Sequence, residues 1–429
     1  EKSRGEITVD IYNTQSWPRT DVVYLSKEQS AVGDRVTDQQ GRSVPSQRLS
    51  TGELAVLIQN VPPMSAKRFL VMKGSPHKRG SVKAERNILE SSLIAVSVNE
   101  QTGAVESLRW KPNDVDLVDR TRGSGLNEYL YVPGRIPQDA RRLANVRVRV
   151  KEKGSLLSSL LVEADAPGCR RYSYEVRVID GIGRVDIINE IDKKAVREKE
   201  GVHIAFPFNV AGGQLRYDVA NGIVRPEADQ LPGSCKNFFS VQSWVDISSD
   251  SYGVTWSTID APLIEIGSIT AEQPWMKTIE PSSTFYSYVM NNYWHTNYKA
   301  DQEGLTLFRY SIMPHGAFSA EKAVRFAKEQ REPLVVAAAD PAKTPVRSLF
   351  HLDSIELVVL SVKPIEGGKS WLVHLYNPTD RDQYTVMMWN RSVPVTRHES
   401  DLFGRIGEPI EWTIKVAAFG NAFVRVDRR

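Results

Sequence analysis

The feature that most constrains the fold is a repeated alternation of apolar and polar residues in short runs separated by turns. Residues 146–150 alternate valine with arginine, and residues 172–179 and 184–191 repeat the alternation around the turn at 180–183. Period-two alternation places one face of a strand in the core and the other in water. Because tight turns join strands in antiparallel order, the chain is predicted to be mostly β, with one large antiparallel region.

Shorter strands flank this region. Four short runs fall within residues 1–75, which predicts a small β-sandwich, and residues 334–429 return to the same pattern. A basic stretch near residues 73–88 favours a solvated linker over a binding patch. The expected division is a small β-sandwich at 1–75, a linker at 76–90, a large β-region at 91–330 and a C-terminal β-sandwich at 331–429.

Very little helix is expected. Ser319 can cap a helix whose apolar residues recur at helical spacing up to Glu329, and Pro333 ends it.

The composition restricts the partners. Of 429 residues, 41% are hydrophobic and 25% charged, with a net charge of +3, so nothing favours nucleic acid or an anionic membrane. No apolar run approaches about 18 residues, so no membrane span is expected. Cys169 and Cys235 are too few for a zinc ribbon, and free thiols are favoured over a single bridge. Cytoplasm and periplasm fit the chain equally well.

Residues 286–298 combine Tyr, Trp, Asn and His at high density. Aromatic faces cover the C–H face of a sugar, while amides and imidazole bond to its hydroxyls. The alternative is a buried aromatic strand that ends in an Asn-rich turn. The long polar loop at 221–236 is a second candidate, in which Arg225, Glu227 and Asp229 either bind a ligand or hold the loop together.

No catalytic residue and no metal ligand are predicted. The sequence contains no metal-binding histidine motif, no nucleophile elbow and no phosphate-binding loop. His351 and Asp353 share a strand face, but two ligands are too few for a metal site, so a surface pair is favoured.

Several long segments carry a family resemblance. SLIAVSVNEQTGAVESL (92–108), GVHIAFPFNV (201–210), LRYDVANGIVRPEADQLPGSCKNFFSVQSWVDIS (215–248), YGVTWSTIDAPLIEIG (252–267), MNNYWHTNYKADQEG (290–304) and FRYSI (308–312) resemble the C-terminal β-region of glycoside hydrolase family 38 α-mannosidases. The resemblance implies a large antiparallel β-supersandwich flanked by smaller β-sandwich domains.

The resemblance also implies an activity for the complete protein, the zinc-dependent retaining hydrolysis of α-mannosides. In that family, zinc held by His and Asp binds the sugar, one Asp attacks the anomeric carbon and another acts as acid and base. Those groups lie in an N-terminal barrel whose motifs this chain does not match. The chain is therefore expected to be a non-catalytic C-terminal part, inactive alone, with zinc in the missing catalytic domain. Its expected partners are that domain and a mannose-containing glycan.

Within the family, the β-region forms one wall of the sugar pocket. GLNEYLYVPG (125–134) is similar to the segment that supplies a tyrosine to the bound mannose, with Tyr129 as the best match and Tyr131 as the fallback. The resemblance places a second part of this pocket wall at residues 290–298. The substrate-binding residues expected there are Asn291, Asn292, Trp294, His295 and Asn297.

Two other functions stay open. A free-standing carbohydrate-binding module needs neither acid nor metal and would use the aromatic stretch directly. A mutarotase-like enzyme would need a general acid and base on one ring, such as His203 or His295 with a carboxylate.

Overall fold

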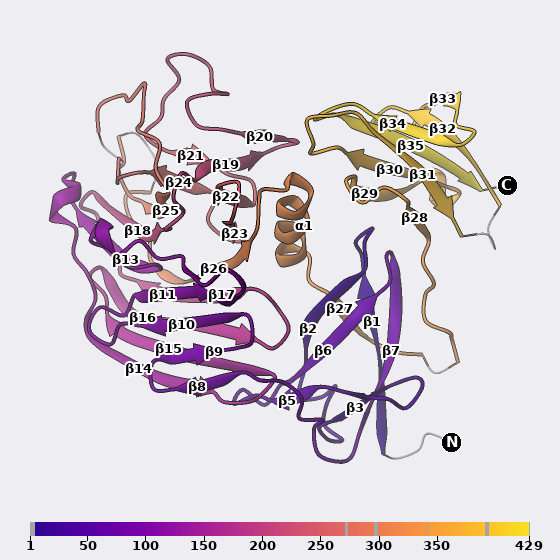
Figure 1. Cartoon of the computed structure of the whole chain (residues 1–429), viewed down its shortest axis with the longest axis horizontal. Helices are drawn as coiled ribbons and strands as arrows, with labels where there is room; N and C mark the ends of the chain where they lie inside the picture. Colours follow the sequence, from indigo (N-terminus) through magenta and orange to yellow (C-terminus); the bar gives the residue numbers. More distant parts are fainter. Residues whose placement is uncertain (1–4, 271–272, 296–298, 341, 391–393, 429) are drawn as a thin grey trace. The chain divides into compact units, whose positions relative to one another are not determined.

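The computed structural model describes residues 5–270, 273–295, 299–340, 342–390 and 394–428. The chain forms two compact units (Figure 1). Unit 2 comprises residues 79–318 and is inserted in sequence within unit 1, which comprises residues 1–78 and 319–429. Strands predominate in both units, and α1 (Ala320–Arg331) is the one α-helix among the described residues. The prediction of a mostly β chain is confirmed.

The largest sheet of unit 2 has nine strands, and every neighbouring pair in it is antiparallel. Alternate residues of β17 are buried, as the period-two pattern predicts. In sheet order the strands are β14 (Ala144–Glu152), β15 (Leu157–Asp165), β16 (Cys169–Ile179), β17 (Val185–Lys193), β26 (Gly304–His315), β23 (Gly253–Thr258), β22 (Trp244–Ser248), β19 (Gln214–Val219) and β20 (Gly222–Val224).

Two five-stranded sheets share a core with the nine-stranded sheet. At its centre, Phe206 packs against Trp256 and Tyr310 with ring centroids 5.1 and 5.0 Å away. This common core confirms the predicted β-supersandwich. One sheet is β13 (Glu128–Pro133), β18 (Glu200–Pro207), β25 (Thr284–Asn291), β24 (Leu263–Ile266) and β21 (Phe239–Ser240). The other is β12 (Val115–Asp116), β11 (Val105–Trp110), β10 (Ile94–Val98), β9 (Ile88–Glu90) and β8 (Lys83–Glu85).

The stretch expected to be a linker, residues 76–90, contains β8 and β9. Each of these strands buries one side chain, Ala84 or Leu89, while Lys83, Glu85 and Ile88 stay exposed. A single buried residue between two exposed neighbours gives too weak an alternation for a strand prediction. The two strands lie against β15 and β16 of the large sheet.

Unit 1 contains two β-sandwich cores. The first core takes Leu334 from beyond the unit 2 insertion, and β27 pairs with β1 there. One sheet is β27 (Val335–Ala338), β1 (Glu6–Asn13), β7 (Ser65–Met72), β3 (Arg35–Asp38) and β4 (Ser43–Val44). The other is β2 (Arg19–Leu25), β6 (Leu54–Val61) and β5 (Ser46–Arg48).

The second core of unit 1 is built from residues 350–426, with Met64 packed against it. One sheet is β28 (Phe350–Leu352), β31 (Gln383–Trp389) and β34 (Thr413–Val416). The other is β29 (Val358–Ile365), β30 (Ser370–Tyr376), β35 (Asn421–Arg428), β32 (Val395–Ser400) and β33 (Ile406–Pro409). The four-part domain division stays a prediction. In the two-unit description, both flanking β-regions and α1 fall in one unit.

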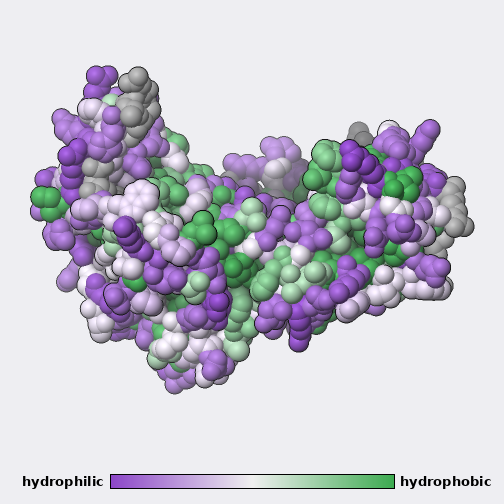
Figure 2. Space-filling view, turned by 90° about the horizontal axis from the view of Figure 1, so that it is seen from above, coloured by the Kyte–Doolittle hydropathy of each residue, from purple (hydrophilic) through white to green (hydrophobic). Residues whose placement is uncertain are grey.

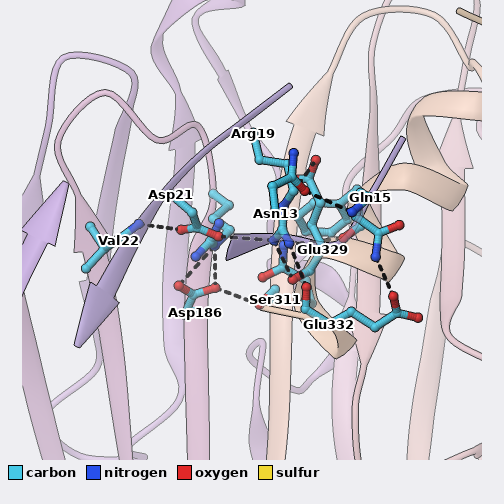
Figure 3. Close-up of polar contacts among 12 residues, drawn as sticks. Asn13, Gln15, Arg19, Asp21, Val22, Asp186, Ser311, Glu329 and Glu332 are labelled. Carbon is cyan, nitrogen blue, oxygen red and sulfur yellow. Dashed lines mark hydrogen bonds and ion pairs between the residues drawn. The ribbon is translucent and has the colours of Figure 1, made fainter. Parts of the chain in front are cut away.

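A buried arginine ties the N-terminal strands of unit 1 to the end of α1 (Figure 3). Arg19, 1% exposed, donates to the carbonyl oxygens of Glu329 at 3.0 Å and Glu332 at 2.6 Å. The last carbonyls of a helix lack partners within the helix, and a cation also interacts favourably with the helix dipole there. Gln15 adds a bond to the Glu332 carboxylate.

No helix in the described part of the chain is long and apolar enough to cross a membrane. Hydrophilic and hydrophobic residues are interspersed over the face drawn in Figure 2.

Candidate functional site

The β13-β18-β25-β24-β21 sheet has one face in the core of unit 2 and a second face rich in polar and aromatic side chains. Ile204, Phe206 and Phe285 point into the core. The register places His203 beside Leu130 and Tyr288 on the opposite face, and places Tyr286 beside Glu265. We call this second face the polar face. It is defined by Glu128, Leu130, His203, Glu265, Tyr286 and Tyr288.

A buried contact between an imidazole and a carboxylate lies at the centre of the polar face. His203 and Glu265 are both fully buried, and His203 Nδ1 lies 2.6 Å from Glu265 Oε2. The Tyr288 ring stacks on the imidazole with centroids 4.6 Å apart. The second oxygen of Glu265 accepts a 2.8 Å bond from the backbone N–H of Thr270. Buried polar groups need such partners, so the bond from Thr270 to Glu265 fixes the start of the loop that follows β24.

One buried amide holds the rest of that loop. The Asn237 side chain, 6% exposed, donates to the carbonyls of Thr270, Gln273 and Pro274 at 3.1, 3.3 and 3.3 Å. Its oxygen accepts a 3.0 Å bond from the N–H of Met276. Asn237 therefore satisfies backbone groups that no strand or helix satisfies, and gives irregular backbone a defined conformation.

A recess of about 770 Å³ opens where this loop meets the polar face. Its lining includes Tyr286, Trp275, Arg142, Gln138 and Gln273. Trp275 is 65% exposed although its indole N–H donates to the carbonyl of Gly233 at 3.2 Å. Burial raises the pKa of the Tyr286 phenol, and the nearby Glu265 carboxylate raises it further, so the phenol stays a donor.

Arg142 is one of two arginines that line the recess, and Arg122 is the other. The Arg142 guanidinium donates to the buried carboxylate of Glu128 and, at 2.9 Å, to the carbonyl of Gly123. The recess thus combines two aromatic rings, two amides and a held guanidinium, within the size range of ligand pockets. Aromatic faces and such donors suit the two sides of a pyranose ring.

The predicted residue Tyr129 lies on β13 but points into the core. Its side chain is fully buried, and its hydroxyl donates to the carbonyl of Pro167 at 2.7 Å and lies 3.3 Å from Cys169 Sγ. Burial raises the pKa of Tyr129. Tyr131 shares this core-facing side, at 8% exposed. The residue between them, Leu130, lines the recess instead. The role predicted for Tyr129 stays a prediction.

The two adjacent asparagines at the end of β25, Asn291 and Asn292, differ in their surroundings. Asn292 is 2% exposed and donates to the carbonyls of Val196, Glu198 and Ala300 at 2.8, 3.3 and 2.9 Å. Its amide therefore holds two chain segments together. Asn291 is exposed and accepts a bond from the N–H of Tyr293.

Trp294 and His295 lie together near Lys199. The Trp294 indole, 36% exposed, donates to the carbonyl of Arg197 at 2.9 Å. The Lys199 ammonium lies 5.4 Å from the centre of its ring and 3.3 Å from His295 Nδ1. Asn297, the last predicted residue, lies outside the described residues. Sugar binding by these residues stays a prediction.

Sequence reasoning missed the residues that line the recess. Trp275 lies in a segment with no apolar periodicity, so no strand or helix is predicted there. The available signal is a single Trp next to Pro274 in a polar segment. Tyr286 belongs to the aromatic stretch 286–298 described from the sequence. The alternation of β25 places Tyr286 and Tyr288 opposite the core-facing Phe285, and this pattern was the available signal.

The other candidate groups are satisfied locally. Arg225 and Asp229 bond to each other, and Glu227 pairs with Lys236 at 2.7 Å, so the 221–236 loop is held by internal contacts. Cys169 and Cys235 are free, as favoured. Among the described residues, no group of three or more His, Cys, Asp or Glu could hold a metal ion.

The comparisons identify the class of domain first. Residues 89–258 match the family model of the glycosyl hydrolases family 38 C-terminal domain. The resemblance of this region to the C-terminal β-region of these enzymes is therefore confirmed, and the match falls within the supersandwich. No curated protein sequence matches the chain.

Two solved structures share the fold over nearly the whole chain. An α-mannosidase from Enterococcus faecalis V583 matches 99% of this chain and 56% of its own, with a TM-score of 0.76 and 14% identity. A protein in the glycosyl hydrolase family 38 from Enterococcus faecalis matches 98% of this chain and 58% of its own, with a TM-score of 0.74 and 15% identity. The chain thus spans somewhat over half the length of these relatives.

Proposed function

We propose that this chain is the C-terminal part of a zinc-dependent retaining α-mannosidase and forms one wall of its mannoside-binding pocket. The observation that carries the proposal is the recess beside the polar face, in a supersandwich that includes a family 38 C-terminal domain. Its aromatic rings and amides suit a neutral sugar. In this proposal, the zinc and the two catalytic carboxylates belong to an N-terminal catalytic domain outside this chain, which is its partner along with a mannose-containing glycan.

The first experiment is hydrolysis of a chromogenic α-mannoside by this chain alone, with and without added zinc. We expect no turnover in either condition, because retaining hydrolysis needs a nucleophile and an acid/base that converge on one bond. The same assay on the complete protein should show turnover that a chelator removes. Turnover by the isolated chain would contradict the proposal.

A second measurement separates a pocket wall from an independent binding module. The isolated chain is titrated with oligomannosides in a calorimeter. A wall supplies only part of the contacts, so we expect no binding at millimolar sugar. Tight binding that Trp294→Ala abolishes would favour the carbohydrate-binding module instead.

A further inference from the structure

A second recess lies in the N-terminal sandwich of unit 1, far in sequence from the proposed mannoside wall. Its volume is about 450 Å³. Both sheets of the sandwich line it: β7 and the β3–β4 turn contribute Lys67, Asp38 and Arg42, and β6 contributes Gln59 and Asn60. Nothing in the proposed function uses this recess.

Lys67 occupies an unusual place for a charged side chain. In the β1–β7 ladder it lies opposite Ile11, and two residues along, Phe69 lies opposite Val9. Ile11, Phe69 and Val9 all belong to the hydrophobic core of the sandwich. Because residues two apart on a strand share a face, Lys67 extends the core-facing row. Its ammonium reaches the opposite sheet and donates to the carbonyl of Gln59 at 2.9 Å.

The charges around Lys67 are not balanced. Arg42 pairs with Asp38 at 2.6 Å, and Arg68 of the same strand pairs with Asp10 through two bonds of 2.8 and 2.9 Å. Within the described part of the chain, no carboxylate lies at ion-pair distance from the Lys67 ammonium. Burial lowers the pKa of Lys67, the positive charge of Arg42 lowers it further, and Asp38 opposes them only in part. The fold therefore holds a cation where its charged form is disfavoured, as binding sites often do.

We propose that this recess binds a small anionic ligand, whose carboxylate or phosphate group pairs with Lys67 and Arg42. The polar remainder of the ligand meets the amides of Gln59 and Asn60, which can donate to and accept from hydroxyls. An anion supplies Lys67 with the charged partner that it lacks, and Arg42, which already pairs with Asp38, adds a second positive charge beside it. A phosphorylated or carboxylated sugar has both features.

The test is calorimetric titration of the full chain with inorganic phosphate, a hexose 6-phosphate, a hexuronate and a neutral hexose. We expect the three anions to bind, with affinity falling as salt rises, and the neutral hexose not to bind. Lys67→Met keeps the length of the side chain without its charge and should weaken binding by about tenfold or more. Arg42→Gln should weaken binding by less. Lys73→Met, at an exposed lysine beyond the same strand, should leave it unchanged.

Three results would overturn the proposal: no binding of any anion, equal binding by the Lys67→Met variant, or equal binding of the neutral hexose. Inorganic phosphate that binds as tightly as the hexose phosphate would support the cation pair and remove the role given to the amides. Lys67→Met should melt at or above the wild-type temperature, because it relieves a disfavoured charge. If Lys67→Met melts at a much lower temperature than the wild type, and Arg42→Gln binds anions as the wild type does, then Lys67 has a structural role and the proposed site is wrong.

Discussion

At the scale of single residues, Trp275 has an exposed ring although hydrogen bonds from Asn237 fix the backbone just before it. Its loop is fixed by Asn237 and Glu265, yet 65% of the residue stays exposed. An exposed indole contributes little to stability, and Trp275 also lines the recess, so Trp275 is the aromatic residue to test for sugar binding.

Trp275→Ala should therefore change sugar binding rather than folding. In the complete protein we expect the KM for an α-mannoside to rise by roughly tenfold, because stacking on a sugar is lost. The free energy of unfolding should change by less than about 0.5 kcal/mol. Trp412→Ala is the matched control, since Trp412 is 72% exposed in unit 1 and lies outside the recess. Equal kinetics for both variants would remove Trp275 from the site.

Glu175 gives a pH-dependent prediction. Burial raises the pKa of its carboxyl, but bonds from Arg177 and Lys151 outweigh burial and lower the pKa to about 2. The folded pKa lies below the unfolded value, so the stabilisation is present above about pH 4.5 and is lost as pH falls toward 2. Glu175→Gln should cost about 2–3 kcal/mol at pH 7 and much less at pH 3.

Urea denaturation at both pH values measures this difference. The control is Glu163→Gln, because Glu163 forms an exposed pair with Arg149 and such pairs contribute little. A deficit of Glu175→Gln that is the same at pH 7 and pH 3 would contradict the assignment.

At the scale of elements, the two asparagines at the end of β25 form a matched pair. Asn292→Ala removes three buried bonds that join residues 196–198 to Ala300 and should cost about 1–3 kcal/mol. Hydrogen exchange should rise in both segments, because their carbonyls lose a shared donor. Asn291→Ala should change exchange little, since Asn291 is exposed. Equal exchange in the two variants would show that the buried amide does not hold the segments.

The sequence predicts strands and the helix well because their signals are local. Ser319 caps α1 as expected, with its hydroxyl accepting from the N–H of Lys322 at 3.4 Å. The alternation of residues 184–191 likewise appears as β17. Even so, a local pattern does not say which face of β13 meets the core: Tyr129 lies on the core-facing side, and its neighbour Leu130 lines the recess.

The loop after β24 was not predictable because its contacts are distant in sequence. Its conformation depends on Glu265, which needs His203 from another strand, and on Asn237 from another loop. The sequence around Glu265, His203 or Asn237 does not indicate which distant residue each of them contacts. The recess follows from this network, so it becomes visible only in three dimensions.

At the scale of the whole molecule, unit 2 interrupts a sandwich that is completed only after it. The first core of unit 1 contains Leu334, and β1 gains a neighbour in β27. Sequence patterns predicted separate flanking domains because each has its own strands. Pairing across an insertion of 240 residues (79–318) leaves no local mark.

This topology predicts how the chain can be divided. Residues 79–318 have a core of their own and, expressed alone, should unfold in one cooperative transition. Residues 1–78 alone should not, because they lack β27 and Leu334 and leave Arg19 without the helix carbonyls it bonds to. The loss of two hydrogen bonds from a buried arginine costs about 3 kcal/mol or more, a large part of the stability of a small domain, although Asp21 stays near Arg19. Co-expression with residues 319–429 should restore a cooperative thermal melt, followed by near-ultraviolet circular dichroism. If residues 1–78 alone melt at the same temperature as the co-expressed pair, the N-terminal sandwich is independent of β27 and α1.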